Sequence, residues 1–422
     1  MIMSMRISSK TIYDVGVGQI SSLQTALART QQQLSTGRKN LSAADDPIAT
    51  ARALEVTQSQ SINTQLVTNR SNAKGTLSLE TVALASSTAI LQDVKTLAVN
   101  AGDGSMTQKD RESLATELEG RLADLLGQAN TADGTGGYVF SGYKSTTLPF
   151  TQTATGAAYQ GDQGQRELQV GSTRKLPISD SGSSVFENNA TGNGTFATLA
   201  DPANYTRGGS GIISAGSVKD ATQLTGHKYQ IDFQVVPATP GIPKVTTYTV
   251  TDLTLNQPVP AAPVPAVPQP YVSGQNISFD GVQFDVKGDP ADLDNFTVQP
   301  STKQSIFTTV SDLIAALRAP GDGAAGQASL NNKLNQAHVN IDAATDNLLS
   351  IQSEVGSRLK ELDYLDSSGD DLNLQYATTL SDLQEVDTVK AISLFTQQQI
   401  TLDAAQKSFK SLSGLSLFNY IT

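Results

Sequence analysis

One hydrophobic pattern limits the folds open to this chain more than any other feature. Between residues 330 and 365, apolar side chains recur in alternating steps of four and three residues. This heptad spacing is typical of a helix that packs against another helix along a seam. A helix cannot bury such a seam by itself, so a partner helix is required. The seam consists of Leu330, Leu334, Ala337, Ile341, Ala344, Leu348, Ile351, Val355, Arg358, Leu362 and Leu365, with Arg358 as its one charged member.

The N-terminal part of the chain offers partner helices. Apolar residues follow heptad spacing over residues 20–34, and Gly37 provides a C-terminal stop. Asp46 and Pro47 then begin a second helix, as N-cap and first helical residue. This helix is predicted to continue to Asn100 because one glycine and no further proline interrupt it. Its seam contains Ala73, Leu77, Leu84, Leu91, Val94 and Ala98, with Glu80 and Ser87 in the two remaining positions.

Three further helices are predicted. A capping box at residues 107–110 should open a helix that ends near residue 133. A second capping box, at residues 301–304, precedes a short apolar helix. A last helix covers residues 389–409.

The middle of the chain has the pattern of β structure. Of the 23 Phe and Tyr residues, fifteen lie in residues 138–304 and one lies in residues 1–137. Apolar and polar residues alternate over residues 228–235, which predicts a half-buried strand. The dipeptide at 280–281, Asp-Gly, predicts a hairpin with a type I′ turn. The proline-rich stretch 257–270 should form an extended surface loop, with docking of a PxxP-binding partner as the alternative.

Together these patterns predict an α+β multidomain chain. Its long terminal helices should pair in a coiled-coil-like bundle, and a β-rich outer domain should be inserted between them. We expect an inner axial helix pair of residues 1–45 with 385–422, a helical rod of 46–139 with 305–384, and an outer domain of 140–304.

The composition excludes most catalytic chemistry. The chain has no cysteine, which removes thiolate nucleophiles and cysteine-ligated metals, and its net charge of −11 argues against binding of nucleic acid or anionic lipid. His227 and His338 have no neighbouring histidine, so both are interpreted as solvated structural residues. Asp45–Asp46 and Asp370–Asp371 are paired carboxylates; the first pair is better explained by helix capping, and neither pair is interpreted as a catalytic or metal site. We therefore predict no enzyme activity, no cofactor, no metal site and no membrane-spanning segment.

Short motifs at both ends of the chain are its most specific feature. They are residues 5–9, 33–47, 397–399, 404–409 and 414–421, with 140–143, 159–162, 176–178 and 185–186 at the entrance to the predicted outer domain. The segments 33–47 and 397–409 resemble the two ends of flagellin-superfamily proteins. The tail at 414–421 is similar to that of the hook-associated protein 3 family, whereas flagellins tend to finish on a leucine pair.

This resemblance implies a structural adaptor subunit of the bacterial flagellum, required for filament assembly and motility. Such a subunit would form the ring between the hook and the flagellin filament. The implied partners are hook-associated protein 1, flagellin, further copies of this chain, and an export chaperone that binds the C-terminal helix. The resemblance also implies an extracellular location, reached through the flagellar type III apparatus without a cleaved signal peptide.

Two sets of residues acquire roles from the resemblance. In the inner axial pair, Leu23, Leu27 and Leu34 should face Leu402, Phe409 and Leu412, and Phe418 and Tyr420 should anchor the chain end against neighbouring subunits. Leu77, Leu84, Leu91, Leu348, Val355 and Leu362 should form the bundle core. The terminal seams are rich in Gln, Ser and Thr and bury little apolar area. We therefore expect residues 5–45 and 385–422 to be mobile in the free monomer and to fold on assembly.

Two other functions remain open from the sequence. A flagellin filament subunit would share the terminal motifs, although the ending at residues 417–420 argues against it. A secreted binding module would use residues 190–300 to recognise a glycan or a host surface.

Overall fold

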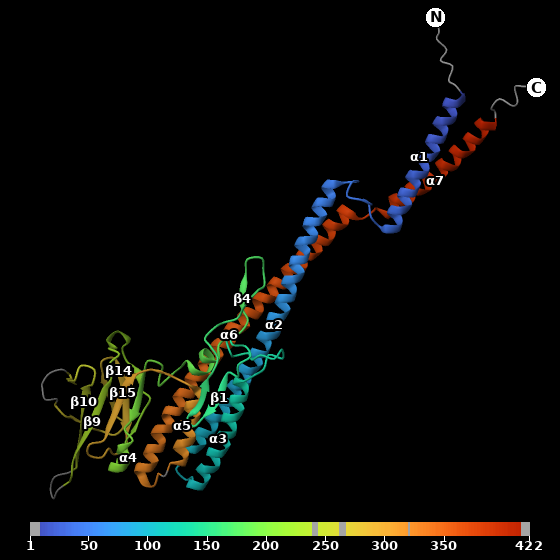
Figure 1. Cartoon of the computed structure of the whole chain (residues 1–422). Helices are drawn as coiled ribbons and strands as arrows, with labels where there is room; N and C mark the ends of the chain where they lie inside the picture. Colours follow the sequence, from blue (N-terminus) through green and yellow to red (C-terminus); the bar gives the residue numbers. More distant parts are fainter. Residues whose placement is uncertain (1–8, 239–243, 261–266, 320, 415–422) are drawn as a thin grey trace, which may run out of the picture. The chain divides into compact units, whose positions relative to one another are not determined.

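The structure, a computed structural model, describes residues 9–238, 244–260, 267–319 and 321–414 (Figure 1). It divides into two units. The terminal unit comprises residues 1–68 and 364–422, and the central unit comprises residues 69–363. Two long helices, α2 (Pro47–Ala101) and α6 (Gly323–Gln384), contribute residues to both units.

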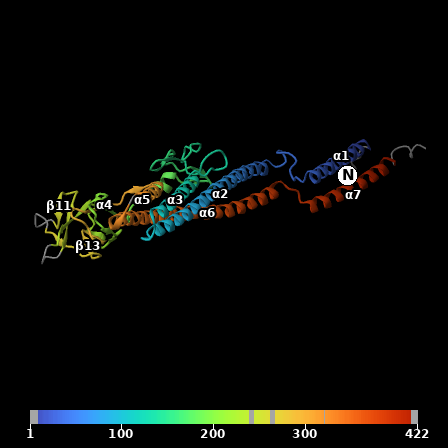
Figure 2. The ribbon, with the colours of Figure 1, turned by 90° about the horizontal axis from the view of Figure 1, so that it is seen from below.

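In the terminal unit, α1 (Ser9–Thr36) and α7 (Thr388–Gly414) lie side by side and run in opposite directions (Figures 1 and 2). Next to them, the amide of Asn63 on α2 donates a buried 2.7 Å hydrogen bond to the carbonyl of Gly369 on α6. The expected pairing of long N- and C-terminal helices is confirmed.

The sequence signals that end and restart these helices act as predicted. Gly37 adopts a positive φ of 68° directly after α1, a conformation that glycine adopts without strain. The Asp46 carboxylate accepts a 2.9 Å hydrogen bond from the Ala49 amide and so caps α2. The predicted capping box of Thr107 and Asp110 also forms, at the start of α3 (Gln108–Ala129).

Four helices form the helical part of the central unit: α2, α3, α6 and α5 (Ile306–Arg318) (Figure 1). Helix α3 ends at Ala129, earlier than expected, because the side chain of Asn130 pairs with the backbone of Phe150. The side-chain amide donates to the Phe150 carbonyl at 3.0 Å, and its oxygen accepts from the Phe150 amide at 2.8 Å.

The predicted capping box at residues 301–304 is wrong. The Ser301 hydroxyl donates to the Thr191 carbonyl at 2.7 Å instead of accepting from a helix. Strand β16 (Lys303–Gln304) pairs with β5 (Asn189–Ala190), so Gln304, the other expected member of the box, belongs to a sheet. Helix α5 follows Ser305, whose side chain makes no capping hydrogen bond.

Residues 140–187 fold onto the helices of the central unit. Two antiparallel hairpins, β1 (Phe150–Thr153) with β2 (Gly156–Tyr159) and β3 (Glu167–Gln169) with β4 (Lys175–Pro177), precede a π-helical turn, η1 (Ser183–Glu187). The rings of Phe150 and Phe186 pack against Phe307 of α5 at centroid distances of 4.9 and 5.7 Å, and Phe140 packs against Phe186 at 5.3 Å. This segment therefore packs with the helices, which differs from the single outer domain expected over residues 140–304.

The remaining strands form two antiparallel sheets. Their shared core contains buried residues from both sheets, among them Phe233, Phe284 and Phe296. The larger sheet has the order β11 (Gln257–Val259), β10 (Val245–Asp252), β9 (Tyr229–Val236), β15 (Asn295–Pro300), β6 (Phe196–Ala200), and β12 (Gln269–Pro270) also pairs with β10. The smaller sheet contains β13 (Asn276–Phe279), β14 (Val282–Lys287), β7 (Ile212–Ile213) and β8 (Ser217–Val218). The short helices α4 (Ala203–Arg207) and η2 (Ala221–Gln223) lie in the connections.

Two predictions for this region are confirmed. Strand β9 alternates between buried and partly exposed residues over most of its length. Asp280 and Gly281, with φ of 41° and 77°, join β13 to β14 in a two-residue hairpin. A Cβ atom at Gly281 would lie 2.3 Å from the carbonyl oxygen of Asp220, so only glycine fits this turn.

The proline-rich stretch is not a polyproline loop along its whole length. Its two ends are β11 and β12, which both pair with strand β10. Proline is tolerated there because a strand at the edge of a sheet does not need every backbone donor. Residues 261–266, between these strands, lie outside the described part.

Candidate assembly surfaces and a buried ion cluster

The register of the α1–α7 pair is fixed at both ends. The Lys39 amide donates to the Gln384 carbonyl at 2.8 Å, just beyond the ends of the two helices. At the far end, the rings of Tyr13 and Phe409 lie 5.1 Å apart. A Cβ atom at Gly16 would lie 2.7 Å from the Phe409 ring, so this glycine allows the close approach of the helices.

The structure describes five of the side chains expected in the contact between α1 and α7. Leu23, Leu27, Leu34, Leu402 and Phe409 are all partly buried. Phe409, however, contacts Tyr13 and Gly16, near the start of α1, whereas Leu34 lies near the opposite end of the antiparallel pair. Sequence periodicity identifies the contact face but not the register. The side chain of Leu412, and residues Phe418 and Tyr420, lie outside the described part.

The terminal unit has almost no apolar core. Among its described residues, the buried apolar side chains are those of Ala53 and Ala391. Thirteen large apolar side chains of the unit are exposed: Tyr13, Val15, Val17, Ile48, Leu54, Ile62, Tyr364, Leu372, Leu374, Val389, Ile392, Leu394 and Ile400. Burial of two methyl groups offsets little of the conformational entropy lost when more than a hundred residues become ordered.

One face of α7 shows this lack of cover most clearly. At about 100° per residue, Val389, Ile392 and Ile400 lie opposite the face that carries Ala391 and Leu402 toward α1. The three residues are 56–78% exposed. A helix that is apolar on two opposite faces is typical of the interior of a larger bundle.

The six residues expected in the bundle core lie inside the central unit. They are 0–2% exposed and come from α2 (Leu77, Leu84, Leu91) and α6 (Leu348, Val355, Leu362). By length and composition, part of α2 could also cross a membrane, but these leucines show that the helix packs into a protein core.

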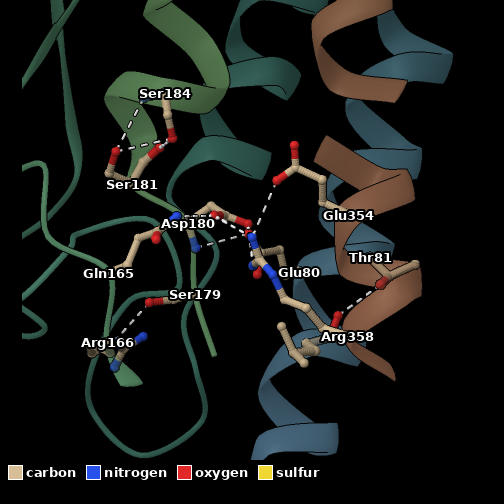
Figure 3. Close-up of polar contacts among 11 residues, drawn as sticks. Glu80, Thr81, Gln165, Arg166, Ser179, Asp180, Ser181, Ser184, Glu354 and Arg358 are labelled. Atoms are coloured by element: carbon tan, nitrogen blue, oxygen red, sulfur yellow. Dashed lines mark hydrogen bonds and ion pairs between the residues drawn. The ribbon is translucent and has the colours of Figure 1, made fainter. Parts of the chain in front are cut away.

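A buried ion cluster interrupts this core (Figure 3). Arg358 of α6 binds Asp180 with both ends of its guanidinium group, at 2.8 and 3.1 Å. The Asp180 carboxylate also accepts from the Gln165 amide at 2.7 Å, and the Asp180 backbone N–H donates to Glu80 of α2 at 3.2 Å. Glu354 adds a longer contact to Arg358 at 3.5 Å. The cluster thus joins α2, α6 and the loop before η1.

The sequence contained part of this cluster. Glu80 and Arg358 were the charged residues in the two heptad seams, and the structure brings them together. Asp180 was missed because it lies in a loop without periodicity. Glu80 is 0% and Asp180 is 4% exposed, so neither carboxylate has access to bulk water that could replace a lost partner.

Burial, reinforced by repulsion from the Asp180 carboxylate, raises the pKa of Glu80 well above its usual range. The nearby Arg358 opposes this rise only in part. Oε2 of Glu80 has no hydrogen-bond partner among the described residues. In the protonated form the Glu80 carboxyl group becomes a donor, and interaction with the Asp180 carboxylate favours that form. When Glu80 is protonated, the buried part of the cluster, which consists of Glu80, Asp180 and Arg358, has no net charge.

We predict that Glu80→Gln makes the protein less sensitive to alkaline pH. A raised folded pKa means that Glu80 favours folding below its unfolded pKa, and that this stability is lost as pH rises toward the folded value. The variant should match the parent near pH 4.5 and gain up to about 1.4 kcal/mol per pH unit above it until the folded pKa is passed. Urea unfolding from pH 5 to 9 measures this. Glu354→Gln, at an exposed position, is the control, and a pH-independent difference for Glu80→Gln would contradict the prediction.

Among the residues weighed for catalysis or metal binding, His227 and Asp45 have structural partners. His227 Nδ1 lies 2.7 Å from Asp252, and His338 is partly buried, so neither is the fully solvated residue expected. Burial lowers the pKa of His338. The Asp45 carboxylate accepts hydrogen bonds from the backbone of Leu41 and Ser42. Over the described ranges, no three His, Asp or Glu residues are grouped as metal ligands.

Comparison with known proteins gives three consistent results. Residues 7–145 match the family model described as the bacterial flagellin N-terminal helical region. The chain is 28% identical to "Flagellar hook-associated protein 3" of Salmonella typhimurium over 418 residues, which is 98% of this chain and 99% of the relative. It is 26% identical to the protein of the same name from Escherichia coli over 415 residues, with the same coverage.

Solved structures agree. Flagellar hook-associated protein-3 from Legionella pneumophila is similar with a TM-score of 0.72 and 31% identity, covering 78% of this chain and 98% of that one. A structure named the flagellar junction protein FlgL from the same organism has a TM-score of 0.69 and 30% identity, covering 79% and 100%. FlgL of Xanthomonas campestris has a TM-score of 0.69 and 27% identity, covering 77% and 99%.

Proposed function

This chain belongs to the flagellar hook-associated protein 3 family and is a structural protein of the bacterial flagellum, and from that premise we propose that it forms the junction ring between hook and filament. Its role there is mechanical rather than catalytic. One side of the ring contacts hook-associated protein 1, the other side receives the first flagellin subunits, and copies of this chain are neighbours within the ring.

The lack of a buried apolar core in the terminal unit is the observation that supports this proposal most directly. Thirteen exposed large apolar side chains accompany two buried alanines in the terminal unit, and seven of the thirteen lie on α1 and α7, so this pair needs neighbouring chains to cover it. Subunits stacked around an axis provide such cover on several sides at once. Leu23, Leu27, Leu34, Leu402 and Phe409 hold the pair together, and the face with Val389, Ile392 and Ile400 remains for contacts between subunits.

Export as an unfolded chain fits the same features. A chain without cysteine cannot form disulfides outside the cell before it reaches its place. We propose type III export without a cleaved signal peptide, to an extracellular position in the flagellum. An export chaperone would cover the exposed apolar face of α7 in the cytoplasm.

Deletion of the gene tests the junction role. Electron microscopy should show complete hooks without filaments, and flagellin should accumulate in the medium because its attachment site is missing. The intact chain supplied in trans should restore filaments and swimming. Filaments of normal number and length on the deletion strain would contradict the proposal, and loss of the filament protein itself would favour the flagellin alternative.

The binding-module alternative has its own test. Thr191 and Thr302 are hydrogen-bonded through their backbones at 2.9 Å, so a short glycine turn can replace residues 192–301. Under the junction proposal, the role of the two β-sheets is separate from ring formation, and the shortened chain should support swimming. Swimming retained with adhesion to surfaces lost would add the binding function to residues 190–300.

A further inference from the structure

The outward face of α2 in the central unit carries no charge over residues 75–92. Leu77, Leu84 and Leu91 define the inward face of the helix. On the opposite side, Leu79 is 39% and Val82 is 65% exposed. We call this surface the neutral face; it comprises Gly75, Ser78, Leu79, Val82, Ala85 and Ala89, all of them exposed.

The other helices of the central unit differ from α2 in this respect. Outward positions of a soluble helix are normally charged, because charge keeps the surface hydrated and prevents association. Helix α3 follows this rule with exposed Lys109, Asp110, Glu112, Glu117, Glu119 and Asp124. Helix α6 follows it with exposed Asp342, Asp346, Glu354, Lys360 and Asp363. The neutral face is therefore a local feature, although the whole chain has a net charge of −11.

The two lysines nearest the neutral face are already paired within the chain. Lys74 binds Asp363 at 2.7 Å, and Lys95 binds Asp342 at 2.5 Å. Both pairs link α2 to α6, one near each end of the face. Their charges compensate each other, so they do not oppose the approach of an uncharged surface.

We propose that the neutral face of α2 is a contact surface for a second copy of this chain. The proposal rests on the proposed function, since it names the surface through which copies meet in the junction ring. Two chains of net charge −11 repel each other, and the repulsion is smallest where neither charge nor desolvation of a charge is involved. Gly75, Ala85 and Ala89 leave room for another helix to approach to about 8–10 Å, with Val82 in the contact.

The size of the face predicts when this contact forms. Residues 75–89 span about 21 Å of helix. This is too little for a stable dimer in solution, which needs about 800 Å² per partner. This face alone therefore does not hold two free chains together. The contact forms when the axial contacts have already placed two copies side by side.

A photo-cross-linker placed at Val82 identifies the protein that contacts the neutral face. Cells that lack the native chain receive a version with p-benzoylphenylalanine at position 82, and assembled flagella are irradiated and analysed by mass spectrometry. We expect a product of twice the mass of the chain that contains only peptides of this chain. The matched control carries the cross-linker at Ser353, an exposed residue of α6, and should give no such product. A product with flagellin or another protein at Val82, or no product in flagella that contain the chain, would overturn the proposal.

A charge at the same position gives a second test. Val82→Glu should leave the melting temperature unchanged, because the side chain points to solvent in the monomer, but should reduce filament number and swimming at least tenfold. Ser353→Glu should change neither. Normal swimming of Val82→Glu would overturn the inference while leaving the junction role intact. If instead the deletion strain builds normal filaments, the junction role fails. The cross-linking result at Val82 still shows whether two copies of the chain meet at the neutral face.

Discussion

Replacing Arg358 with leucine should lower the free energy of unfolding of the central unit by about 3–5 kcal/mol, although leucine fits the heptad pattern better than arginine does. Arg358 is the cation that binds both oxygens of Asp180, and its side chain is 12% exposed. Without it, the 4% exposed Asp180 carboxylate remains buried beside Glu80 with no opposite charge. Urea unfolding followed by circular dichroism measures the loss.

An exposed ion pair provides the control. Arg174 also binds a carboxylate with two nitrogens, that of Glu361 on α6, but its side chain is 55% exposed. Water can replace the lost partner there, so Arg174→Leu should have little effect. Equal effects of the two substitutions would show that burial of the cluster does not matter. The triple change of Glu80, Asp180 and Arg358 to uncharged residues should recover much of the stability, because no buried charge is then left unpaired.

On the purified monomer, the rates of amide hydrogen exchange should differ strongly between the terminal helices and the central unit. Backbone amides of α1 and α7, including those of Leu23 and Leu402, should exchange orders of magnitude faster than that of Leu84 in α2. The physical reason is the two buried alanines of the terminal unit, which provide almost no free energy against opening, whereas Leu84 is 0% exposed in the central core. Mass-spectrometric exchange at neutral pH measures the difference.

The same experiment on assembled flagella is its control. If neighbouring subunits cover the apolar faces of α1 and α7 there, as proposed, the amides of these helices should become protected while that of Leu84 changes little. Strong protection at Leu23 or Leu402 in the monomer would contradict the prediction. It would mean that the α1–α7 pair is stable by itself and does not need assembly to fold.

Local helix signals were predictable because they act within a few residues. Gly37, Asp46 and the capping box at Thr107 each satisfy backbone groups of their own helix, and all three act as expected. The capping box at 301–304 had the right residue types and was wrong, because Ser301 found its partner at Thr191, more than a hundred residues away. A local pattern cannot reveal such a competitor.

For the candidate assembly surfaces too, the sequence predicted some features and not others. Heptad spacing identified Leu77, Leu84 and Leu348 as inward-facing, and their burial in the structure follows from the helical repeat alone. The register of α1 against α7 did not follow, since shifting one helix by seven residues preserves the pattern. The contact between Gly16 and Phe409 selects one register through shape.

The sequence by itself determined the helical ends, the β-rich middle and the family, because periodicity, capping and terminal motifs are properties of short segments. Only the tertiary structure showed the role of the two charged residues in the heptad seams. Glu80 and Arg358 break two separate patterns in the sequence, and they become one cluster through Asp180, which no pattern marks. Likewise, the uncharged residues around Val82 become a surface only when α3 and α6 are seen to carry the charge. Pairing energy and exposure depend on distances between segments, and those distances exist only in the folded chain.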